Sequence, residues 1–415
     1  MAVALAASGR YVLARSTKYH RPRGPTCFSG RCDGCLMRVD GVGNVMTCRA
    51  PARDGMHVET QNVLGSADAD LLSATDWFFP GGMNHHEMFT SNKVLNRAMQ
   101  KIARRIAGVG ELPSRLVPDS PPREAACDVL VIGGGPAGLA AATHAARAGA
   151  ATILVEETDE TGGHLLSFPA GVIDERGREV NAPTAAAALT REAEAAGVRV
   201  LVRHAAIGAY DDGVLVHAKD HVLRVRARSV VVATGAHEGS MAFEGADLPG
   251  VIGVRAACLL LRHGVLPGER VAIVGTGAWS DALARALRSR GAEVFGPFAP
   301  GEVLRARGRP AVRGLDVVRG SGASGEKESI VCDCVAIAPP PSPDYELAEQ
   351  AGAKVTFSGE TFVVEAARSD GVTAMPGVFA VGECAGVEGL REILAQARDA
   401  GDRAAASLTS EGVDV

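Results

Sequence analysis

The chain has 415 residues and a mass of 42.7 kDa, a length that predicts about two to four domains. Hydrophobic residues make up 47%, charged residues 22% and aromatic residues 4%, with 50 glycines, which is typical of a globular protein and excludes collagen-like, disordered and coiled-coil classes. The formal charge of −5 gives no overall basic field, so we expect neither nucleic acid nor an anionic membrane surface as a partner.

The first ten residues, MAVALAASGR, form a short apolar stretch. No basic residue precedes this stretch and it runs directly into Arg10, so we do not expect a secretory signal. No apolar run along the chain approaches the ~18–20 residues that span a bilayer. We therefore expect a cytoplasmic protein without a membrane span.

Four cysteines lie close together, with the spacing Cys27-x4-Cys32-x2-Cys35-x12-Cys48. Plant-type [2Fe–2S] centres use C-x4-C-x2-C and a more distant fourth thiolate, because a tight loop presents three sulfurs at one edge of the cluster. A zinc site, which favours two C-x2-C pairs, and an incidental grouping are the alternatives. Residues 1–63 carry nine Arg and Lys against four Asp and Glu, so they form a distinct basic module.

The next segment, residues 64–122, reads as a helical connector. Apolar residues recur near helical spacing over 92–107, which predicts a helix there. Four prolines between residues 113 and 122 mark the clearest domain boundary, since proline lacks the amide donor that regular elements need. The pair His85-His86 has no further ligand nearby, so we interpret it as a surface or interface pair and not as a metal site.

From Cys127 onward, short apolar strands alternate with alanine-rich helices, which predicts parallel sheets covered on both faces. The expected helices include 138–148 and 281–290, and the two strand-glycine-helix units suggest two similar nucleotide-binding folds, one inserted in the other. Cys332 and Cys334 are one residue too close for a C-x2-C redox pair, so we expect core thiols there. The expected strands are 127–132, 152–155, 229–233, 270–274, 293–295, 334–337 and 378–381.

A glycine-rich loop follows the first of these strands. Gly133, Gly135 and Gly138 have the G-x-G-x-x-G spacing, which provides a tight turn, close approach of backbone amides to a pyrophosphate and close helix packing. The next strand ends at Glu156, where a carboxylate is expected to accept hydrogen bonds from a ribose hydroxyl. The residues assigned to this site also include Pro136, Ala137, Glu157 and Gly163.

Two later segments favour a flavin dinucleotide over a nicotinamide. Thr234-Gly235 ends one strand, and Gly382-Glu383 ends another far downstream. This set resembles the two-dinucleotide-binding flavoprotein family, which implies that Glu383 reaches the ribityl chain of FAD. The family position is usually aspartate, and glutamate is one methylene longer.

A second glycine loop contains Gly275 and Gly277 but has Ser280 in place of the third glycine and a bulky Trp279. The strand that follows ends without an acidic residue, so the expected partner of an NAD ribose is missing. We consider NAD(P) binding possible here, and a domain kept only for packing is the rival interpretation.

The segment Arg15-Ser-Thr-Lys-Tyr-His-Arg-Pro-Arg-Gly24, the four cysteines and residues 58–62 resemble the iron–sulfur domain of the hydrogen cyanide synthase, opine oxidase and heterotetrameric sarcosine oxidase group. The resemblance continues through residues 86–89 and 105–110 into the flavin domain, and it covers essentially the whole chain. It implies two Rossmann-like, glutathione-reductase-like domains after a small plant-ferredoxin-like α+β domain, although the usual opening β-hairpin is missing. The implied domains are 1–63 for [2Fe–2S], 64–122 as connector, 123–245 with 373–415 for FAD, and 246–372 as the inserted NAD(P)-like domain.

The resemblance also implies a function. We expect an FAD- and [2Fe–2S]-dependent electron-transfer subunit of an amine or amino-acid dehydrogenase or oxidase, acting on sarcosine, proline, glycine or an opine. An amine-oxidase-type flavoprotein partner would hold the substrate, since no proton-abstracting residue can be identified in this chain. The alternatives are a stand-alone NAD(P)H:acceptor oxidoreductase and a non-catalytic scaffold subunit.

Overall fold

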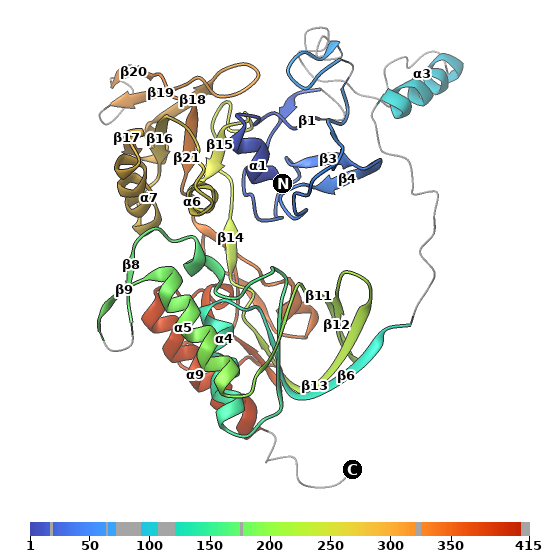
Figure 1. Cartoon of the computed structure of the whole chain (residues 1–415), viewed down its shortest axis with the longest axis vertical. Coiled ribbons are helices and arrows are strands. Elements are labelled where there is room, and N and C mark those ends of the chain that lie inside the picture. The colour runs from blue at the N-terminus through green and yellow to red at the C-terminus, as the bar shows by residue number, and fades with distance from the viewer. Residues whose placement is uncertain are drawn as a thin grey trace. The chain divides into compact units, whose positions relative to one another are not determined.

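The computed structural model describes residues 1–16, 20–63, 65–71, 93–106, 121–174, 177–319 and 325–407 (Figure 1). The pair His85-His86 and the prolines at 113 and 118 lie outside these ranges. The chain divides into two compact units. Unit 1 comprises Met1–Val117 and Ser240–Pro339, and unit 2 comprises Pro118–Gly239 and Pro340–Val415.

The N-terminal module, residues 1–63, opens with a short helix and continues in small antiparallel sheets. Helix α1 spans Ala2–Ala7, and its alanines Ala2 and Ala6 face the core. One sheet pairs β1 with β2 and another has the order β4-β3-β5. The helix predicted over 92–107 is present as α3 (Lys93–Ile106). The strands are β1 (Ala14–Arg15), β2 (Pro22–Arg23), β3 (Leu36–Val39), β4 (Val42–Met46) and β5 (Val58–Glu59).

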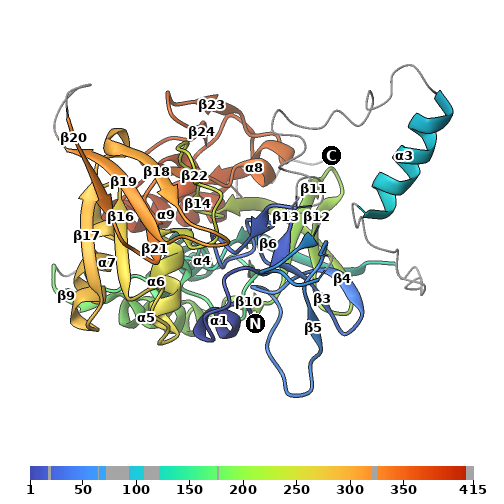
Figure 2. The same cartoon turned by 90° about the horizontal axis from the view of Figure 1, so that it is seen from above.

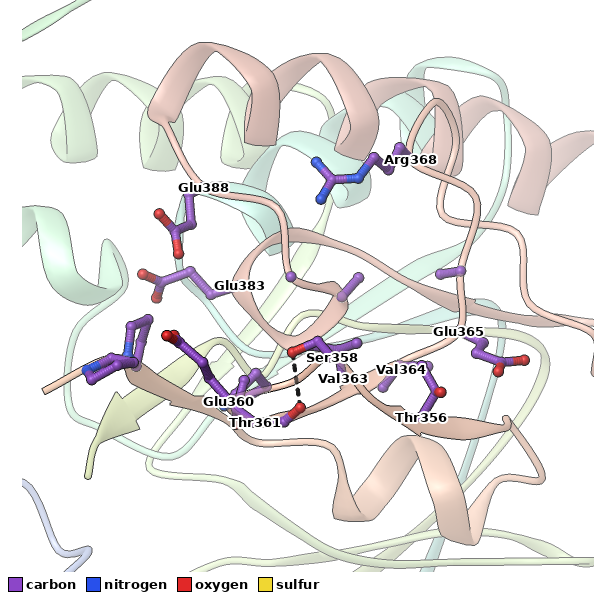
Figure 3. Close-up of a pocket in the computed structure, with 16 residues that line it drawn as sticks. Thr356, Ser358, Glu360, Thr361, Val363, Val364, Glu365, Arg368, Glu383 and Glu388 are labelled. Atoms are coloured by element: carbon purple, nitrogen blue, oxygen red, sulfur yellow. Dashed lines mark hydrogen bonds between the residues drawn. The ribbon is translucent and has the colours of Figure 1, made fainter. Parts of the chain in front are cut away.

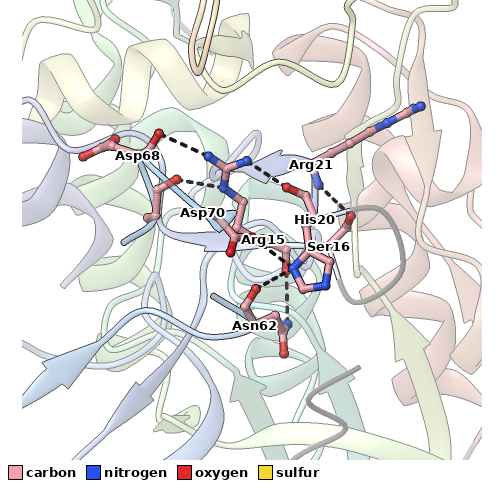
Figure 4. Close-up of polar contacts among 8 residues, drawn as sticks. Arg15, Ser16, His20, Arg21, Asn62, Asp68 and Asp70 are labelled. Atoms are coloured by element: carbon pink, nitrogen blue, oxygen red, sulfur yellow. Dashed lines mark hydrogen bonds and ion pairs between the residues drawn. The ribbon is translucent and has the colours of Figure 1, made fainter. Parts of the chain in front are cut away.

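A buried polar network ties the β1–β2 region to residues 62–70 (Figure 4). The Arg15 guanidinium is buried and donates to the carbonyl oxygens of Ala67 and His20, both at 2.8 Å. His20 Nδ1 lies 3.0 Å from Asp70 Oδ2, and both side chains are almost fully buried. Buried charges are costly unless they are paired and hydrogen-bonded, so this network holds the two segments in one arrangement.

The second half of unit 1, residues 240–339, is called the inserted segment below. Its central sheet is parallel, with the order β15-β21-β16-β17 (Figure 1). A separate antiparallel sheet has the order β18-β19-β20 (Figure 2). Apolar side chains of both sheets form one core cluster. The elements are β15 (Val251–Gly253), α6 (Val254–Arg262), β16 (Arg270–Val274), α7 (Ala278–Ser289), β17 (Glu293–Phe298), η3 (Pro300–Glu302), β18 (Val303–Arg307), β19 (Gly314–Arg319), β20 (Glu326–Ile330) and β21 (Cys334–Ile337).

The N-terminal module and the inserted segment share one hydrophobic core. Figure 1 shows α1 beside α6 and β15, and the core cluster joins side chains from both parts. The module contributes Ala2, Ala6, Leu13, Phe28, Cys35 and Met37, and the inserted segment contributes residues of β15, α6, β16, α7 and β21. The N-terminal module therefore buries its apolar side chains together with the inserted segment, which also has a second core cluster of its own.

Unit 2 is built on a seven-stranded sheet with the order β10-β7-β6-β13-β12-β11, in which β25 also pairs with β13. Helices α4 and α9 pack against each other, and a methyl group on Gly401 would overlap the carbonyl oxygen of Ala141. The elements up to residue 238 are β6 (Arg123–Ile132), α4 (Pro136–Arg147), β7 (Thr152–Glu156), η2 (Gly163–Leu166), β8 (Gly171–Ile173), β9 (Glu179–Asn181), α5 (Ala182–Ala195), β10 (Arg199–Val202), β11 (Ala205–Tyr210), β12 (Gly213–His217), β13 (Val222–Val232) and β14 (Ala236–Glu238).

The chain re-enters unit 2 at Pro340, earlier than the sequence-based boundary at 372. The reason is that β14 pairs with β22 and α8 packs against β11, so residues 340–372 belong to unit 2. The elements of this return are β22 (Pro341–Pro343), α8 (Glu346–Gln350), β23 (Val355–Phe357), β24 (Phe362–Val364), β25 (Val378–Ala380), η4 (Gly382–Ala385) and α9 (Leu390–Ala406).

The strands expected to be parallel are parallel, and the sheet of unit 2 also has an antiparallel part that was not predicted. Strands β10, β7, β6, β13 and β25 are parallel, but β11, β12 and β13 form an antiparallel meander on the same sheet. The meander is half polar, and its apolar residues alternate instead of forming the continuous runs that indicate a buried parallel strand.

Within the described ranges, none of the helices combines the length and the hydropathy of a membrane-spanning helix.

Candidate functional site

The first glycine loop connects β6 to α4 and has the geometry of a dinucleotide-binding turn. Gly133 adopts φ +106°, and a methyl group there would overlap the carbonyl oxygen of Ala233. A methyl on Gly138 would overlap the carbonyl oxygen of Gly133, so this glycine lets the helix approach the strand. Around Gly135, in contrast, a methyl would meet only Gly163 Cα, at 3.9 Å. The loop is therefore tightly packed at Gly133 and Gly138 but has free space beside Gly135, where a pyrophosphate is expected to approach.

Pro136 and Ala137 form the first turn of α4, directly after this loop. Proline is well suited to the start of a helix, because its missing amide hydrogen would have no partner there. The amide groups of this first turn carry the positive end of the helix dipole, which favours an anion at this position.

Glu156, at the end of β7, holds its carboxylate beside the glycine loop. Its Oε2 accepts a hydrogen bond from the Gly134 amide at 2.7 Å, and its Oε1 accepts from the amide and the hydroxyl of Thr158, both at 2.7 Å. The residue is 8% exposed. The neighbouring Glu157 is exposed. Glu156 is therefore fixed in the position expected for a ribose-binding carboxylate.

A second turn borders the glycine loop. The amide of Gly162 donates to the carbonyl oxygen of Gly134 at 2.7 Å, and Gly163, with φ +54°, lies against Gly135. A methyl on Gly163 would come within 2.9 Å of Gly135 Cα. Gly163 therefore lies against the glycine loop, and its role in binding a cofactor stays a prediction.

The two late segments meet in the same unit. Thr234 donates its hydroxyl to the carbonyl oxygen of Asp344, and Gly235 has φ +76°. Glu383 Oε2 lies 3.9 Å from where a Gly235 methyl would stand, and Gly382 donates its amide to Gln396 Oε1 at 2.9 Å. The structure therefore brings Thr234, Gly235, Gly382 and Glu383 together, as the sequence predicted for one site.

The sequence did not indicate that Glu383 has a histidine partner. His164, on η2, places Nδ1 3.2 Å from Glu383 Oε2, although 219 residues separate the two. The Glu383 side chain is 20% exposed and that of His164 43%. The extra methylene of glutamate over aspartate lengthens the reach of this carboxylate. The only sequence signal for His164 is its place directly after Gly162-Gly163.

Glu383 also lines a hollow with a volume of about 460 Å³ (Figure 3). Its walls come from β22, the β23–β24 hairpin and the loop that follows Glu383. The carboxylates of Glu360, Glu383 and Glu388 point to one side of this hollow in Figure 3, and Arg368 is a cation among the lining residues. The lining can accept hydrogen bonds from hydroxyl or amine groups of a bound molecule.

The second glycine loop, between β16 and α7 in the inserted segment, keeps part of the dinucleotide geometry. Gly275 has φ +93° and Gly277 φ +130°, and a methyl on Gly275 would come within 2.7 Å of the Ala338 carbonyl oxygen. Ser280, in place of the third glycine, is 1% exposed, and its hydroxyl has no hydrogen-bond partner within the described ranges. Arg255 lies over the Trp279 ring at 5.2 Å. The turn at Gly275 and Gly277 is preserved, but the first turn of α7 carries the larger side chains of Trp279 and Ser280.

The four clustered cysteines lie as two pairs in unit 1. Cys27 and Cys32 place their sulfurs 3.3 Å apart, and Cys35 and Cys48 do the same. A [2Fe–2S] cluster takes two thiolates at each of its two irons, which suits two pairs. Within the part of the chain that the structure describes, no three His, Cys, Asp or Glu gather around one point as ligands of a single ion. The two sulfur pairs themselves suit a two-iron cluster.

Hydrogen bonds favour the thiolate form of one member in each pair. The hydrogen bond to Cys27 lowers the pKa of Cys32 to about 5, and the bond to Cys32 together with burial raises the pKa of Cys27. In the other pair, the bond to Cys48 lowers the pKa of Cys35 to about 7, and the pKa of Cys48 is raised. Thiolates are the metal-binding form of cysteine, so the site is prepared to exchange protons for a metal.

The remaining cysteines are core thiols. Cys258, Cys332, Cys334 and Cys384 are buried and Cys127 is partly buried. Burial raises the pKa of Cys332 to about 12 and that of Cys384 to about 11. The interpretation of Cys332 and Cys334 as core residues agrees with their burial.

Two segments of the chain match known protein families. Residues 1–63 match the 2Fe-2S iron-sulfur cluster binding domain, and residues 127–316 match the pyridine nucleotide-disulphide oxidoreductase family. The alpha subunit of the sarcosine oxidase of Rhizobium meliloti is 31% identical over 401 residues, which cover 87% of this chain and 40% of that protein. The chain is sarcosine oxidase alpha-like. The A subunit of the opine oxidase of the same organism is 33% identical over 153 residues, 36% of this chain and 33% of that protein. The sarcosine oxidase alpha-like chain thus spans two fifths or less of the length of these relatives.

A solved structure shows the same fold. The L-proline dehydrogenase from P. horikoshii superposes with a TM-score of 0.73 and 22% identity, covering all of this chain and 70% of that one. The fold of the sarcosine oxidase alpha-like chain is therefore the glutathione-reductase-like fold of pyridine nucleotide-disulphide oxidoreductases, with an N-terminal [2Fe–2S] domain. This confirms the fold class expected from the sequence.

Proposed function

We propose that the chain is the FAD- and [2Fe–2S]-containing electron-transfer subunit of an amine or amino-acid dehydrogenase or oxidase complex. This proposal rests on the presence, in one chain, of two pairs of thiols at the spacing of a cluster and of a glycine loop with free space beside Gly135. The carboxylate of Glu156 lies next to this loop, at the position expected to bind a ribose. The names of its relatives, which are subunits of sarcosine oxidase and opine oxidase, support the substrate class.

The residues divide into two binding sets. Cys27, Cys32, Cys35 and Cys48 would hold the cluster. In unit 2, Gly135 and the start of α4 would face the pyrophosphate, Glu156 the ribose and Glu383 the ribityl chain. Flavin accepts two electrons together and can release them singly, and a [2Fe–2S] cluster carries one, so this pair of groups suits transfer between two-electron and one-electron partners.

The oxidation of the amine itself is assigned to a partner. We infer a separate flavoprotein of the amine-oxidase type, which would bind sarcosine, proline, glycine or an opine and break the C–H bond next to nitrogen. The contacts described above are those expected of residues that bind and orient a nucleotide. The subunit names of the relatives support a heteromeric assembly.

A second candidate is a stand-alone NAD(P)H:acceptor oxidoreductase. The preserved turn at Gly275 and Gly277 favours it, whereas the filled position at Ser280 and the missing acidic residue after β17 weaken it. The two candidates differ in whether the purified chain alone oxidises NAD(P)H.

The test is to purify the chain anaerobically and measure three quantities: bound nucleotide by chromatography after heat release, iron, and acid-labile sulfide. The proposal expects FAD together with iron and sulfide in equal amounts, and no dye reduction by NAD(P)H from the chain alone. Rapid dye reduction by NAD(P)H supports the second candidate instead. A preparation with flavin but neither iron nor sulfide would contradict both the cluster assignment and the proposed electron relay.

A further inference from the structure

The loop that carries Cys27 and Cys32 is held from outside its own module. The carbonyl oxygen of Thr26 accepts a hydrogen bond from the Gly253 amide of the inserted segment at 3.0 Å. On the other side of Cys27, the Phe28 side chain is 3% exposed and lies in the core shared with the inserted segment. Thr26 is therefore bound to a residue more than 200 positions away, and Phe28 is buried in a core that the inserted segment helps to form.

Phe28 also has an unusual backbone. Its φ is +54°, in the left-handed region, which bulky side chains rarely adopt because Cβ crowds the carbonyl oxygen. Such a conformation persists only where the surrounding contacts outweigh its cost. Here the compensating contact is the burial of the ring in the shared core.

The backbone of this loop directs amide groups toward a sulfur. Phe28 and Gly30 both have positive φ, at +54° and +87°, and the amides of Ser29 and Arg31 donate to Cys27 Sγ at 3.4 and 3.3 Å. Successive amides in such alternating conformations form a concave site for anions, a geometry found at iron–sulfur centres. Amide hydrogen bonds to the sulfurs are among the factors that set the reduction potential of a cluster.

These observations point to a role for the inserted segment. We propose that it anchors the cluster loop, with Phe28 and Gly253 as positioning residues that hold the amides of the loop on Cys27. This inference rests on the proposed function, because it assumes that the four thiols hold a [2Fe–2S] cluster. It assigns to the second dinucleotide-type fold a task that does not depend on nucleotide binding.

Further contacts cross the same boundary near the loop. The Tyr11 hydroxyl donates to the carbonyl oxygen of Pro267 at 3.0 Å, and Arg23 pairs with Asp247 at 3.8 Å. Gly24, two residues before Thr26, packs against Pro249, since a methyl there would lie 3.0 Å from Pro249 Cβ. The inserted segment thus supports the loop at several points, and the contacts at Thr26 and Phe28 lie closest in sequence to a cluster thiol.

One pair of variants tests the hydrogen bond between Gly253 and Thr26. Gly253 has φ −67°, a value that proline adopts, and Gly253→Pro removes the amide donor and places the proline ring against the Thr26 carbonyl oxygen, so it disrupts this contact. Gly253→Ala keeps the donor and is the matched control. Losing one hydrogen bond of ordinary strength corresponds to roughly a fivefold effect. We expect iron release to a chelator from the reconstituted full chain to be at least about fivefold faster in Gly253→Pro than in Gly253→Ala.

A second pair of variants tests whether the Phe28 ring anchors the loop. Phe28→Gly relieves the backbone strain but removes the ring, whereas Phe28→Leu keeps an apolar side chain and the strain. If the ring is the anchor, Phe28→Gly releases iron faster than Phe28→Leu and shifts the midpoint potential of the cluster to a more negative value. If the backbone conformation alone matters, Phe28→Gly equals or exceeds the wild type in iron retention, and the inference is wrong.

Hydrogen exchange in the apo chain provides a readout without the cluster. We expect the amides of residues 27–32 to exchange faster in Gly253→Pro and in Phe28→Gly than in their controls. A wild type that binds no iron overturns the proposed function and this inference with it. A wild type that binds iron, with equal release and equal exchange in all four variants, overturns the anchoring role alone.

Discussion

Replacing Gly135 by alanine tests the cofactor site while leaving the fold in place. Gly135 has φ −72° and ψ −178°, which alanine adopts freely, and the added methyl would meet only Gly163 Cα at 3.9 Å. A glycine-to-alanine change at such a compatible position stabilises a protein by about 0.4–1 kcal/mol, because the unfolded chain loses conformational freedom. The apo chain with Gly135→Ala is therefore expected to be slightly more stable than the wild type.

The same methyl would stand where the pyrophosphate is expected to approach the loop amides. Losing one hydrogen bond to a charged group costs about 1.5–3 kcal/mol, which corresponds to roughly a 10- to 100-fold loss of affinity. Titration of the apo chain with FAD, followed by flavin fluorescence, measures this loss. Urea unfolding of the apo chain measures the change in stability.

Gly138→Ala is the matched control in the same loop. Its methyl would overlap the carbonyl oxygen of Gly133, so this change is expected to destabilise unit 2 as a whole, with cofactor binding lost as a consequence. The reasoning is refuted if Gly135→Ala binds FAD as tightly as the wild type. It is equally refuted if Gly135→Ala unfolds as readily as Gly138→Ala, because the space above Gly135 would then not be open.

Three further changes test other parts of the molecule. Cys32→Ser is expected to abolish iron and sulfide binding by removing one of four ligands, while Cys127→Ser keeps both; equal iron in the two variants argues against the cluster site. Asp70→Asn removes the charge paired with buried His20 and is expected to lower the free energy of unfolding by about 1–3 kcal/mol in urea titrations, and an unchanged midpoint contradicts this. Burial raises the pKa of Cys384 to about 11 from 9.0, so the folded chain keeps a proton that the unfolded chain releases, and stability falls as the pH rises from about 9 to about 11. Cys384→Ala should remove up to about 3 kcal/mol of that alkaline loss, measured under reducing conditions, and an identical pH profile would exclude this thiol as its source.

The sequence predicted well those features that depend on local spacing. The glycine loop at Gly133 and the four thiols each need residues at fixed short intervals, and the structure shows the turn and the sulfur pairs at these places. The central strands and helices of both nucleotide-type folds also followed from apolar runs and alanine-rich segments, because each run is long enough to identify its element.

Features that depend on distant contacts were not predicted. The pairing of His164 with Glu383 joins residues that no local pattern connects. Nor did composition mark the return of the chain to unit 2 at Pro340, which follows from the pairing of β14 with β22. Residues 1–63 alone likewise do not reveal the left-handed conformation of Phe28, whose ring lies in the core shared with the inserted segment.

The joint core of the N-terminal module and the inserted segment has a consequence for biosynthesis. Residues 1–63 leave the ribosome first, but most of the core cluster in which Leu13 and Phe28 lie belongs to residues beyond 250, which are made much later. At about 5–20 residues per second, the module waits for tens of seconds with an uncovered apolar face. Insertion of a metal cluster into a finished loop would therefore come late in synthesis, and a product truncated before residue 250 would be prone to aggregate.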